Sequence, residues 1–371
     1  ELETALLPYL VAMTERGIRV DIDQAERTKQ ELLKREKAVL KHIKRLVGHD
    51  VEVWAAASIA RAFEKVGLPY PKTEKGSPSF TKAWLTDHDH ELPKFILQAR
   101  ELNKTQGTFI DSILRYVSKD SRVHSHINQV RSDDGGTVSG RISMSNPNAQ
   151  QIPARDPELG PMIRRLFLPE ENEQWAAIDY SQQEPRILTS YAKRFANYRN
   201  MEMGGVDEFI KEYNENPDAD FHSMVSDLSG LPRSTAKVIN LALMYGMGVN
   251  KLSQQLDIPL EEAKELTKQY HNKVPFVRQL TQGIQRYLDH PSSGGSLRSL
   301  KGRKLRFDKF EPDSFEMNKA LPYEEAVALY GPTVKLRRAY TWKSTNRLIQ
   351  ASAADQTKQA IVDVCEAGTI P

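Results

Sequence analysis

The sequence has very little cysteine: Cys365 is the only one among 371 residues. A single cysteine cannot form a disulfide within the chain, which excludes the disulfide-stapled class of small secreted domains and favours a reducing, intracellular compartment. Long apolar runs are also lacking, since none approaches the roughly 20 residues of a membrane span. The first ten residues, ELETALLPYL, do not follow the basic-then-apolar order of a signal peptide. We therefore expect an intracellular protein without membrane contact.

A strong net charge is absent as well, because 52 Lys and Arg residues against 49 Asp and Glu leave only +3. The cations are nevertheless unevenly distributed. Residues 27–47 hold eight Lys or Arg against two Glu, and residues 298–309 hold six against Asp308. Local basic density of this kind suits a polyanion such as nucleic acid. A solvated helix face and a solvated hairpin would explain the two stretches equally well.

The spacing of apolar residues predicts a mixed chain of many helices and few strands. The three-and-four rhythm from Asp23 to Val47, ended by Gly48, indicates a long amphipathic helix. Further helices are predicted at 55–66, 93–117, 182 onward, 231–247, 259–272 and about 345–365. Strands are predicted at 122–130 and, as the buried segment QWAAID, at 174–179, with a hairpin at 296–307 that turns at Lys301-Gly302. The stretch 131–157 is too rich in Gly, Ser, Asn and Pro for regular structure, and so long a loop is usually functional or disordered.

The segment IDYSQQEPR, residues 178–186, offers two carboxylates after the expected strand. In one interpretation Asp179 simply ends the strand, while Ser181 and Glu184 form a capping box and Pro185 occupies the first helical turn. In the other, Asp179 is an oxygen ligand for Mg²⁺, which proteins hold with one or two carboxylates plus waters and substrate phosphates. A two-metal site would then need a second acid from elsewhere in the molecule.

A second segment, PRSTAKVINLALMYGMG, places Arg233, Lys237, Leu241 and Tyr245 in one row along a helix. Like charges at i and i+4 repel unless an anion lies across them, and a helix N-terminus favours phosphate. This pattern suits a nucleotide with its phosphates near the helix start and its base near Tyr245, where Gly246 allows close approach. A surface helix with two solvated cations and a core stripe is the alternative.

Together, SGRISMSNPNAQQIP, DYSQQEPR and RSTAKVINLALMYG closely resemble the motifs of family A DNA polymerases, the group typified by bacterial DNA polymerase I, with the character of bacteriophage or viral members. The resemblance extends across nearly the whole chain. It implies an α+β right-hand fold with an antiparallel palm sheet and a helical thumb and fingers. The implied subdomains are 1–22 leading into the palm, 23–120 thumb, 121–200 palm, 201–340 fingers with insertions, and 341–371 palm.

The resemblance also implies roles for single residues. Asp179 and the backbone carbonyl of Tyr180 would bind metal, in a complete site of two Mg²⁺ ions for which Mn²⁺ is expected to substitute. Glu184 would exclude a ribose 2′-hydroxyl, and Lys237 would bind the triphosphate and protonate the leaving pyrophosphate. The other implied nucleotide contacts are Gln182, His222, Arg233, Leu241 and Tyr245, and the implied DNA contacts are Arg141, Asn148, Gln150, Gly246 and Gln350.

Several features depart from the family pattern. Leu241 stands where most members have Phe or Tyr, so we expect altered nucleotide selectivity, and Trp342 and Lys343 stand near the place of a template-contacting Arg. Residues 196–218 and 310–340 look like insertions. The family's second catalytic aspartate follows a histidine beyond the helix of Gln350, yet the last histidine here is His290. We therefore expect that aspartate to lie outside these 371 residues.

The implied reaction is attack of a primer 3′-hydroxyl on the α-phosphate of a deoxynucleoside triphosphate, with release of pyrophosphate. The implied partners are primer-template DNA and deoxynucleoside triphosphates. The protein is expected to be a monomer in the cytoplasm of a bacterium or of an infected host cell. Two alternatives are a relative of the single-subunit RNA polymerases, against which Glu184 argues, and a primer-template binding fragment without catalysis.

Overall fold

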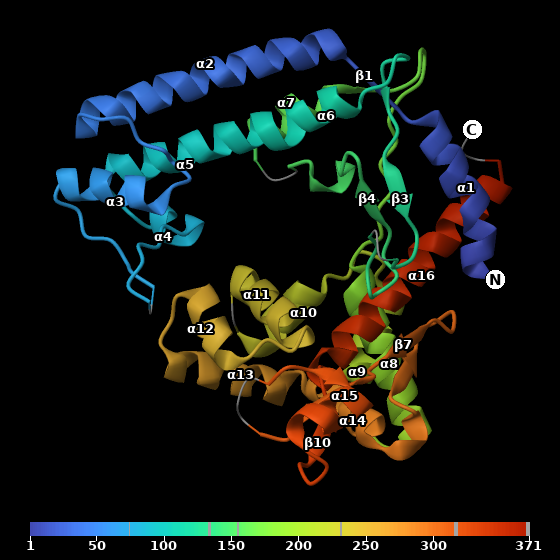
Figure 1. Ribbon diagram of the computed structural model, residues 1–371. Helices are drawn as coiled ribbons and strands as arrows, with labels where there is room; N and C mark the ends of the chain where they lie inside the picture. The colour runs from blue at the N-terminus through green and yellow to red at the C-terminus, as the bar shows by residue number, and fades with distance from the viewer. Residues whose placement is uncertain (74, 133–134, 154–155, 231, 315–317, 369–371) are drawn as a thin grey trace. The chain divides into compact units, whose positions relative to one another are not determined.

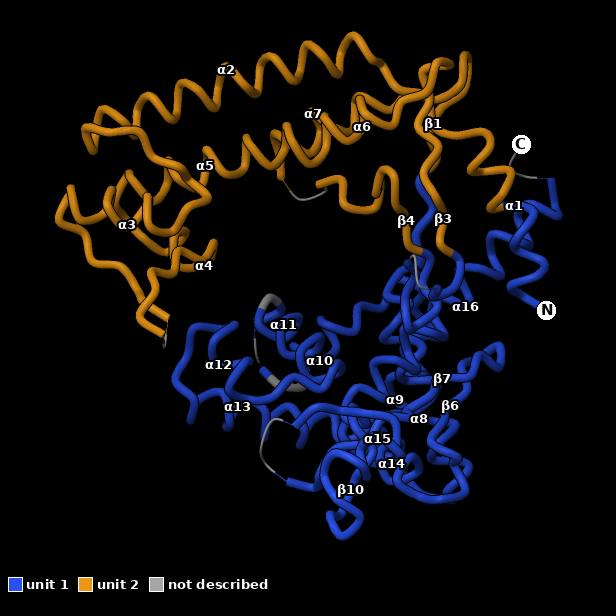
Figure 2. The backbone as a smooth tube through the Cα atoms, viewed as in Figure 1, with its two compact units in different colours: residues 1–9, 129–142, 177–371 blue, residues 10–128, 143–176 orange. Residues whose placement is uncertain are grey.

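The computed structural model describes residues 1–371 apart from 74, 133–134, 154–155, 231, 315–317 and 369–371. The chain forms two compact units, each assembled from separate stretches of sequence (Figure 2). Unit 1 comprises 1–9, 129–142 and 177–371, and unit 2 comprises 10–128 and 143–176. Helix α1 (Leu2–Arg16) carries the chain from the first unit into the second.

The long basic helix predicted from Asp23 to Val47 is confirmed as α2 (Ile22–Val47), and it organises unit 2. Asp21 caps its start by accepting from the backbone N–H of Gln24 at 2.8 Å, and Gly48 ends it in the left-handed conformation that glycine adopts without a Cβ penalty. The helix lies along α5 (Glu91–Lys104), as Figure 1 shows. Its apolar face is buried there, while its cations stay largely at the surface.

The helices predicted at 55–66 and 93–117 are confirmed in unit 2, the second with a local change in winding, and the structure adds shorter helices that were not predicted. Helix α5 continues through a π-helical segment (Thr105–Ile110) into α6 (Asp111–Tyr116). The shorter helices are α3 (Ala56–Lys65), α4 (Lys82–Thr86), the 3₁₀ turn Ala149–Gln151 and α7 (Leu159–Arg164). Two apolar cores hold these helices together, one around Phe63 and Ile96 and one around Leu32 and Ile163.

The strands of unit 2 are short and antiparallel. Strand β1 (Ile18–Val20) lies between β2 (Arg122–Val123) and β5 (Phe167–Leu168). Strand β3 (His126–Asn128) pairs with β4 (Ser143–Ser145), so that Ile127 faces Met144 in register. The strand predicted at 122–130 is therefore present as two pieces that join different sheets.

Unit 1 is mainly helical and has one large apolar core. Its helices are α8 (Gln183–Arg199), α9 (Val206–Glu215), α10 (Phe221–Ser229), α11 (Arg233–Met244), α12 (Val249–Leu256), α13 (Leu260–Lys273), α14 (Pro275–Asp289), α15 (Tyr323–Tyr330) and α16 (Ser344–Glu366). Helix α8 packs on α14 and α16, and the rings of Phe209, Phe221 and Phe276 meet in the core at centroid distances of 5.1 and 5.3 Å. No helix within the described residues is long and apolar enough to cross a membrane.

Two small antiparallel sheets complete unit 1. The hairpin predicted at 296–307 is confirmed as β6 (Ser296–Arg298) and β7 (Lys304–Arg306), with Leu297 opposite Leu305 and Gly302 at a positive φ of 83°. The stretch predicted as an insertion, 310–340, holds α15 and most of a three-stranded sheet. That sheet has the order β10-β8-β9 and consists of Leu336–Arg338, Lys309–Pro312 and Leu321–Pro322.

The prediction of a buried strand at 174–179 is wrong. None of the strands that the structure describes pairs with this segment, and its residues are exposed, including Ile178 at 86%. Residue pattern alone does not make a strand, because backbone N–H and C=O groups need a neighbouring strand for their hydrogen bonds. Asp179 therefore lies in an exposed, irregular segment and belongs to unit 1.

Candidate active site

The turn before α8 positions the first set of candidate residues. The predicted capping box of Ser181 and Glu184 is not formed, because the N-cap position is Gln182, which has a positive φ of 51° and makes no side-chain cap. Its amide instead joins this turn to the start of α10, accepting from the N–H of Phe221 at 2.5 Å and donating to the carbonyl of Ala219 at 2.9 Å. Pro185 lies in the first turn, as predicted, and its side chain is buried.

Glu184 is free of the cap and forms an ion pair with Arg141 from the loop at 129–142. The carboxylate is largely buried, and this burial raises its pKa above the ordinary value even though Arg141 opposes the shift. Within the described residues this largely buried acid at the helix start has Arg141 as its ion-pair partner, which restricts the position of its side chain. Any ligand that lies against this turn has to fit beside the Glu184 side chain.

Asp179 and Tyr180, the expected metal ligands, are both exposed. Within the described part of the chain, no residue hydrogen-bonds to or pairs with the Asp179 carboxylate, so its oxygens are open to a ligand. The described residues also contain no group of three or more His, Cys, Asp and Glu side chains that could hold a metal ion. The position of the second carboxylate that a two-metal site needs stays a prediction.

The residues predicted to form a row on α11 lie on one face, as their spacing requires. Arg233, the first cation of this row, has an ion-pair partner. Arg233 donates from Nε to Oδ2 of Asp220 at 2.7 Å, and its Nη2 lies 2.5 Å from the same oxygen. Asp220 is the N-cap of α10, and its carboxylate offsets the charge of Arg233, one of the two cations at i and i+4. Lys237 is exposed and has no ion-pair partner among the described residues.

His222, on the first turn of α10, faces the cationic end of α11. Its Nδ1 lies 3.0 Å from Nδ2 of Asn240 on α11. Burial lowers the pKa of His222, Asp220 raises it, and the positive charges of Lys237 and Arg233 lower it further. The structure therefore brings together a histidine and two cations from adjoining helices, a combination that suits a polyphosphate.

The far end of α11 holds the residues expected near the base. Leu241 is 37% exposed on the helix surface, and Tyr245 at the C-cap position packs partly into the core. Gly246 has a positive φ of 69°, and a Cβ there would lie 3.1 Å from the carbonyl oxygen of Trp342. Both constraints favour glycine, which lets the chain turn closely past Trp342.

The predicted DNA contacts are divided between the units. Arg141 belongs to unit 1, as does Gln350, which is half-buried on α16. Asn148 and Gln150 belong to unit 2. The Asn148 side chain accepts from the N–H of Gln150 at 3.1 Å and so caps the 3₁₀ turn. The structure thus places Arg141 with Glu184 but leaves the grouping of the whole set as a prediction.

Two functional partners were missed from the sequence. Asp220 was detectable as a helix N-cap, because an Asp directly before an apolar helical run is a capping signal, but its pairing with Arg233 is a tertiary contact. The pairing of Arg141 with Glu184 joins residues 43 positions apart in the sequence, so no local sequence pattern predicts it.

Comparisons with known proteins show the family and the fold of the chain. The sequence model of a family described as DNA polymerase family A matches residues 22–369. A DNA-directed DNA polymerase of Pseudomonas phage M6 is 31% identical over 99% of this chain and 58% of its own length, and DNA polymerase DpoZ of Acinetobacter phage SH-Ab 15497 is 30% identical over 99% and 59%. A solved structure of the polymerase domain of Pol1 from M. smegmatis, in complex with DNA primer-template and dNTP, superposes with a TM-score of 0.75 at 25% identity, covering 98% of this chain and 59% of that one. The chain thus spans rather less than two thirds of the relatives it matches.

Proposed function

Because the chain belongs to DNA polymerase family A, we propose that it supplies the nucleotide-binding part of a template-directed DNA polymerase. The observation that carries the proposal is the convergence of His222, Arg233 and Lys237 where α10 meets α11. Three positive or protonatable side chains at one place match the charge of a triphosphate, and the family match supports a deoxynucleotide as that triphosphate.

The chain's own residues then have distinct tasks. Arg233 and Lys237 neutralise and orient the phosphates, so that the α-phosphate is presented to the primer 3′-hydroxyl, and Lys237 donates a proton to the departing pyrophosphate. Asp220 holds Arg233 until the nucleotide arrives and competes for it afterwards. Tyr245 and Gly246 border the space for the templating base, and Leu241 faces the sugar.

A divalent cation is required by this chemistry, and the donors present are compatible with it. The open carboxylate of Asp179 and the carbonyl of Tyr180 are hard oxygen ligands of the kind that Mg²⁺ binds together with water and phosphate oxygens. When bound, the cation would lower the pKa of the primer hydroxyl and neutralise the developing phosphate charge. We propose Mg²⁺, with Mn²⁺ able to replace it.

Glu184 favours a DNA polymerase over the related single-subunit RNA polymerases. Its side chain pairs with Arg141 at the start of α8, and in our proposal it would fill the space that a ribose 2′-hydroxyl needs. We also propose that unit 2 grips the duplex through the thumb helix α2, and that the other subdomains follow the boundaries predicted from the sequence. Binding by α2 would be independent of sequence and sensitive to salt.

Primer extension tests the proposal in the full-length gene product that contains these residues. We expect Mg²⁺-dependent addition of the complementary deoxynucleotide, and a large loss of rate in Asp179→Asn and Lys237→Gln variants that still bind primer-template. The proposal is overturned if the wild-type protein adds nucleotides without regard to the template, or if both variants extend primers at the wild-type rate.

A further inference from the structure

Helix α11 has a buried polar side chain, Asn240, among apolar ones. Its neighbours on the helix, Ala236, Ile239 and Leu243, are buried. Asn240 is 0% exposed, and its Oδ1 has no hydrogen-bond partner among the described residues. Burying an amide is costly unless its polar groups are paired, and an aliphatic side chain would pack here without that cost. The amide therefore points to a task other than packing.

The amide group of Asn240 meets the ring of His222 on α10. Its Nδ2 lies 3.0 Å from Nδ1 of the imidazole. An amide NH₂ group can only donate, so Nδ1 has to be the acceptor. A neutral imidazole carries one N–H, and when Nδ1 accepts, that N–H is at Nε2. The contact therefore selects the Nε2–H tautomer of His222.

The second ring nitrogen of His222 is open to a ligand. The ring is half-buried, and Nε2 has no hydrogen-bond partner among the described residues and is not enclosed by them. Lys237, three residues before Asn240 on α11, and Arg233, one turn earlier, both act on this ring through their charge. A phosphate oxygen held by these cations accepts hydrogen bonds. It therefore matches an N–H at Nε2 and is repelled by a lone pair there.

The charges around His222 favour the neutral ring. Burial lowers its pKa, and Lys237 and Arg233 act in the same direction, while Asp220 at the N-cap of α10 opposes them. In an imidazolium both nitrogens donate, so Nδ1–H would face the NH₂ group of Asn240, one donor against another. Geometry and charge thus agree on a neutral ring with its N–H at Nε2.

We propose that Asn240 is a positioning residue that holds His222 as the Nε2–H tautomer, so that the ring donates a hydrogen bond to the phosphates of the incoming nucleotide. This inference rests on the proposed function, which places the triphosphate beside His222, Arg233 and Lys237. Asn240 acts through the imidazole and does not touch the nucleotide. The buried amide of α11 thereby contributes to nucleotide affinity rather than to packing.

The tautomer is measured in the nucleotide-free protein. Long-range ¹H–¹⁵N correlation spectra of histidine-labelled protein distinguish a protonated ring nitrogen from an unprotonated one, and the signals of His222 are identified by their loss in His222→Gln. Above the pKa of His222, we expect the proton on Nε2 in wild type. In Asn240→Asp it should move to Nδ1, because a carboxylate only accepts. A wild-type ring with its proton on Nδ1, or an equal mixture of the two tautomers, overturns the proposal.

Nucleotide affinity measures the consequence, in complexes with a 3′-dideoxy-terminated primer, Mg²⁺ and the complementary dNTP. We expect Asn240→Asp to weaken nucleotide binding by about tenfold or more, the effect of losing a hydrogen bond to a charged group. Asn240→Leu, which leaves the tautomer unfixed, should weaken it less. In a His222→Gln background, Asn240→Asp should have little further effect. An equal loss in that background would show that the added charge, and not the tautomer, weakens binding, and it overturns the proposal.

The matched control is Asn197→Asp, which makes the same chemical change at an exposed position of α8 and should alter neither the His222 tautomer nor the affinity. Unchanged primer-template binding shows that a variant is folded. If Asn240→Asp does not fold, Asn240→Leu supplies the test, and wild-type nucleotide affinity in Asn240→Leu overturns the proposal. Failure of the proposed function looks different, because the wild-type complex would then bind no nucleotide while the spectra of the free protein still report the tautomer.

Discussion

At the scale of single residues, Glu184 shows how one side chain acquires a role from its tertiary setting. Its spacing from Ser181 fits a helix cap, but the structure assigns it to Arg141 and leaves the cap unformed. A carboxylate held by an arginine at the start of α8 has a fixed volume and position. That is the property a steric filter for ribose requires.

Substitutions of Glu184 should separate volume from charge. We predict that Glu184→Ala lowers the preference for deoxynucleotides over ribonucleotides at least tenfold, about 1.4 kcal/mol of discrimination, because the blocked space opens. Glu184→Gln keeps the volume and should retain most of the preference. The ratio of kcat/KM values for matched dNTP and NTP measures this, and an unchanged ratio in Glu184→Ala would refute the role.

His222 provides a second residue-scale prediction, which concerns pH. Burial lowers its pKa below 6.5, with Lys237 and Arg233 acting in the same direction and Asp220 against it. Lys237→Gln should therefore raise the His222 pKa, and Asp220→Asn should lower it further. Titration of ring resonances by NMR checks both directions.

His271 is the internal control for that titration. Its pKa is also lowered by burial, but the charge acting on it is Arg278, so the Lys237 and Asp220 variants should leave it unchanged. Equal shifts in both histidines would contradict the local explanation.

Because the folded-state pKa of His222 lies below its unfolded value, the contribution of His222 to stability is complete above about pH 6.5 and is lost as the pH falls through the folded pKa.

At the scale of elements, helices with a clear apolar rhythm were predictable, whereas other helices, such as α7, α12 and α14, and the lone strands were not. The apolar rhythm of residues 23–47 and the terminating Gly48 contain what a helix needs, since its hydrogen bonds are internal. The segment 174–179 has strand-like composition but no described pairing partner, and its apolar side chains are exposed. The hairpin at 296–307 was predictable because each strand supplies the other's partner.

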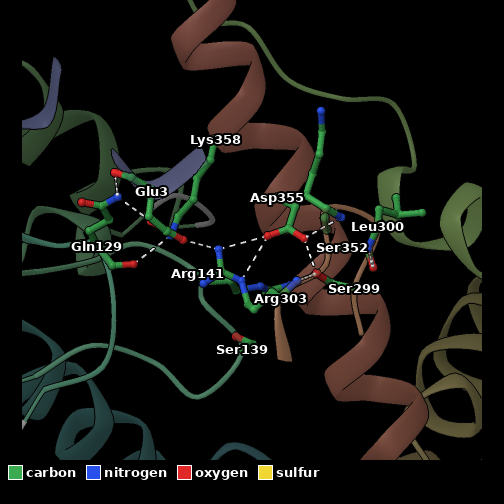
Figure 3. Close-up of polar contacts among 12 residues, drawn as sticks. Glu3, Gln129, Ser139, Arg141, Ser299, Leu300, Arg303, Ser352, Asp355 and Lys358 are labelled. Atoms are coloured by element: carbon green, nitrogen blue, oxygen red, sulfur yellow. Dashed lines mark hydrogen bonds and ion pairs between the residues drawn. The ribbon is translucent and has the colours of Figure 1, made fainter. Parts of the chain in front are cut away.

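The anchoring of that hairpin yields a stability prediction. Asp355 of α16 is 1% exposed and accepts from Nε of Arg303 at 3.1 Å and from the N–H of Lys301 at 3.2 Å (Figure 3). It also accepts from the hydroxyl of Ser299. Asp355→Ala leaves Arg303 with one ion-pair partner among the described residues and removes acceptors for Ser299 and Lys301. Breaking a buried ion pair costs about 3 to 5 kcal/mol, so the free energy of unfolding in urea should fall by that order. Asp363→Ala, an exposed position on the same helix, should change it by less than about 0.5 kcal/mol. Equal effects of the two substitutions would show that Asp355 does not anchor the hairpin.

At the scale of the whole molecule, the chain's membership of DNA polymerase family A was predictable from three motifs, and the α+β fold followed from it. The tertiary pairs of the site were not predictable: Asp220 with Arg233, Asn240 with His222, and Arg141 with Glu184 depend on how separate segments pack. The division into two discontinuous units was also not predictable from sequence patterns, because each unit combines stretches that are separate in the sequence.

The central claim is that α11 and its neighbours select a nucleotide according to a template. Its most direct measurement is the dissociation rate of this chain from a primer-template with a 3′-dideoxy-terminated primer, in Mg²⁺ and each dNTP in turn, since this requires no bond formation. We predict that the complementary dNTP alone slows dissociation at least tenfold, about 1.4 kcal/mol, and that Lys237→Gln abolishes most of the effect. Equal retention with all four dNTPs, or no retention with any, would contradict the account.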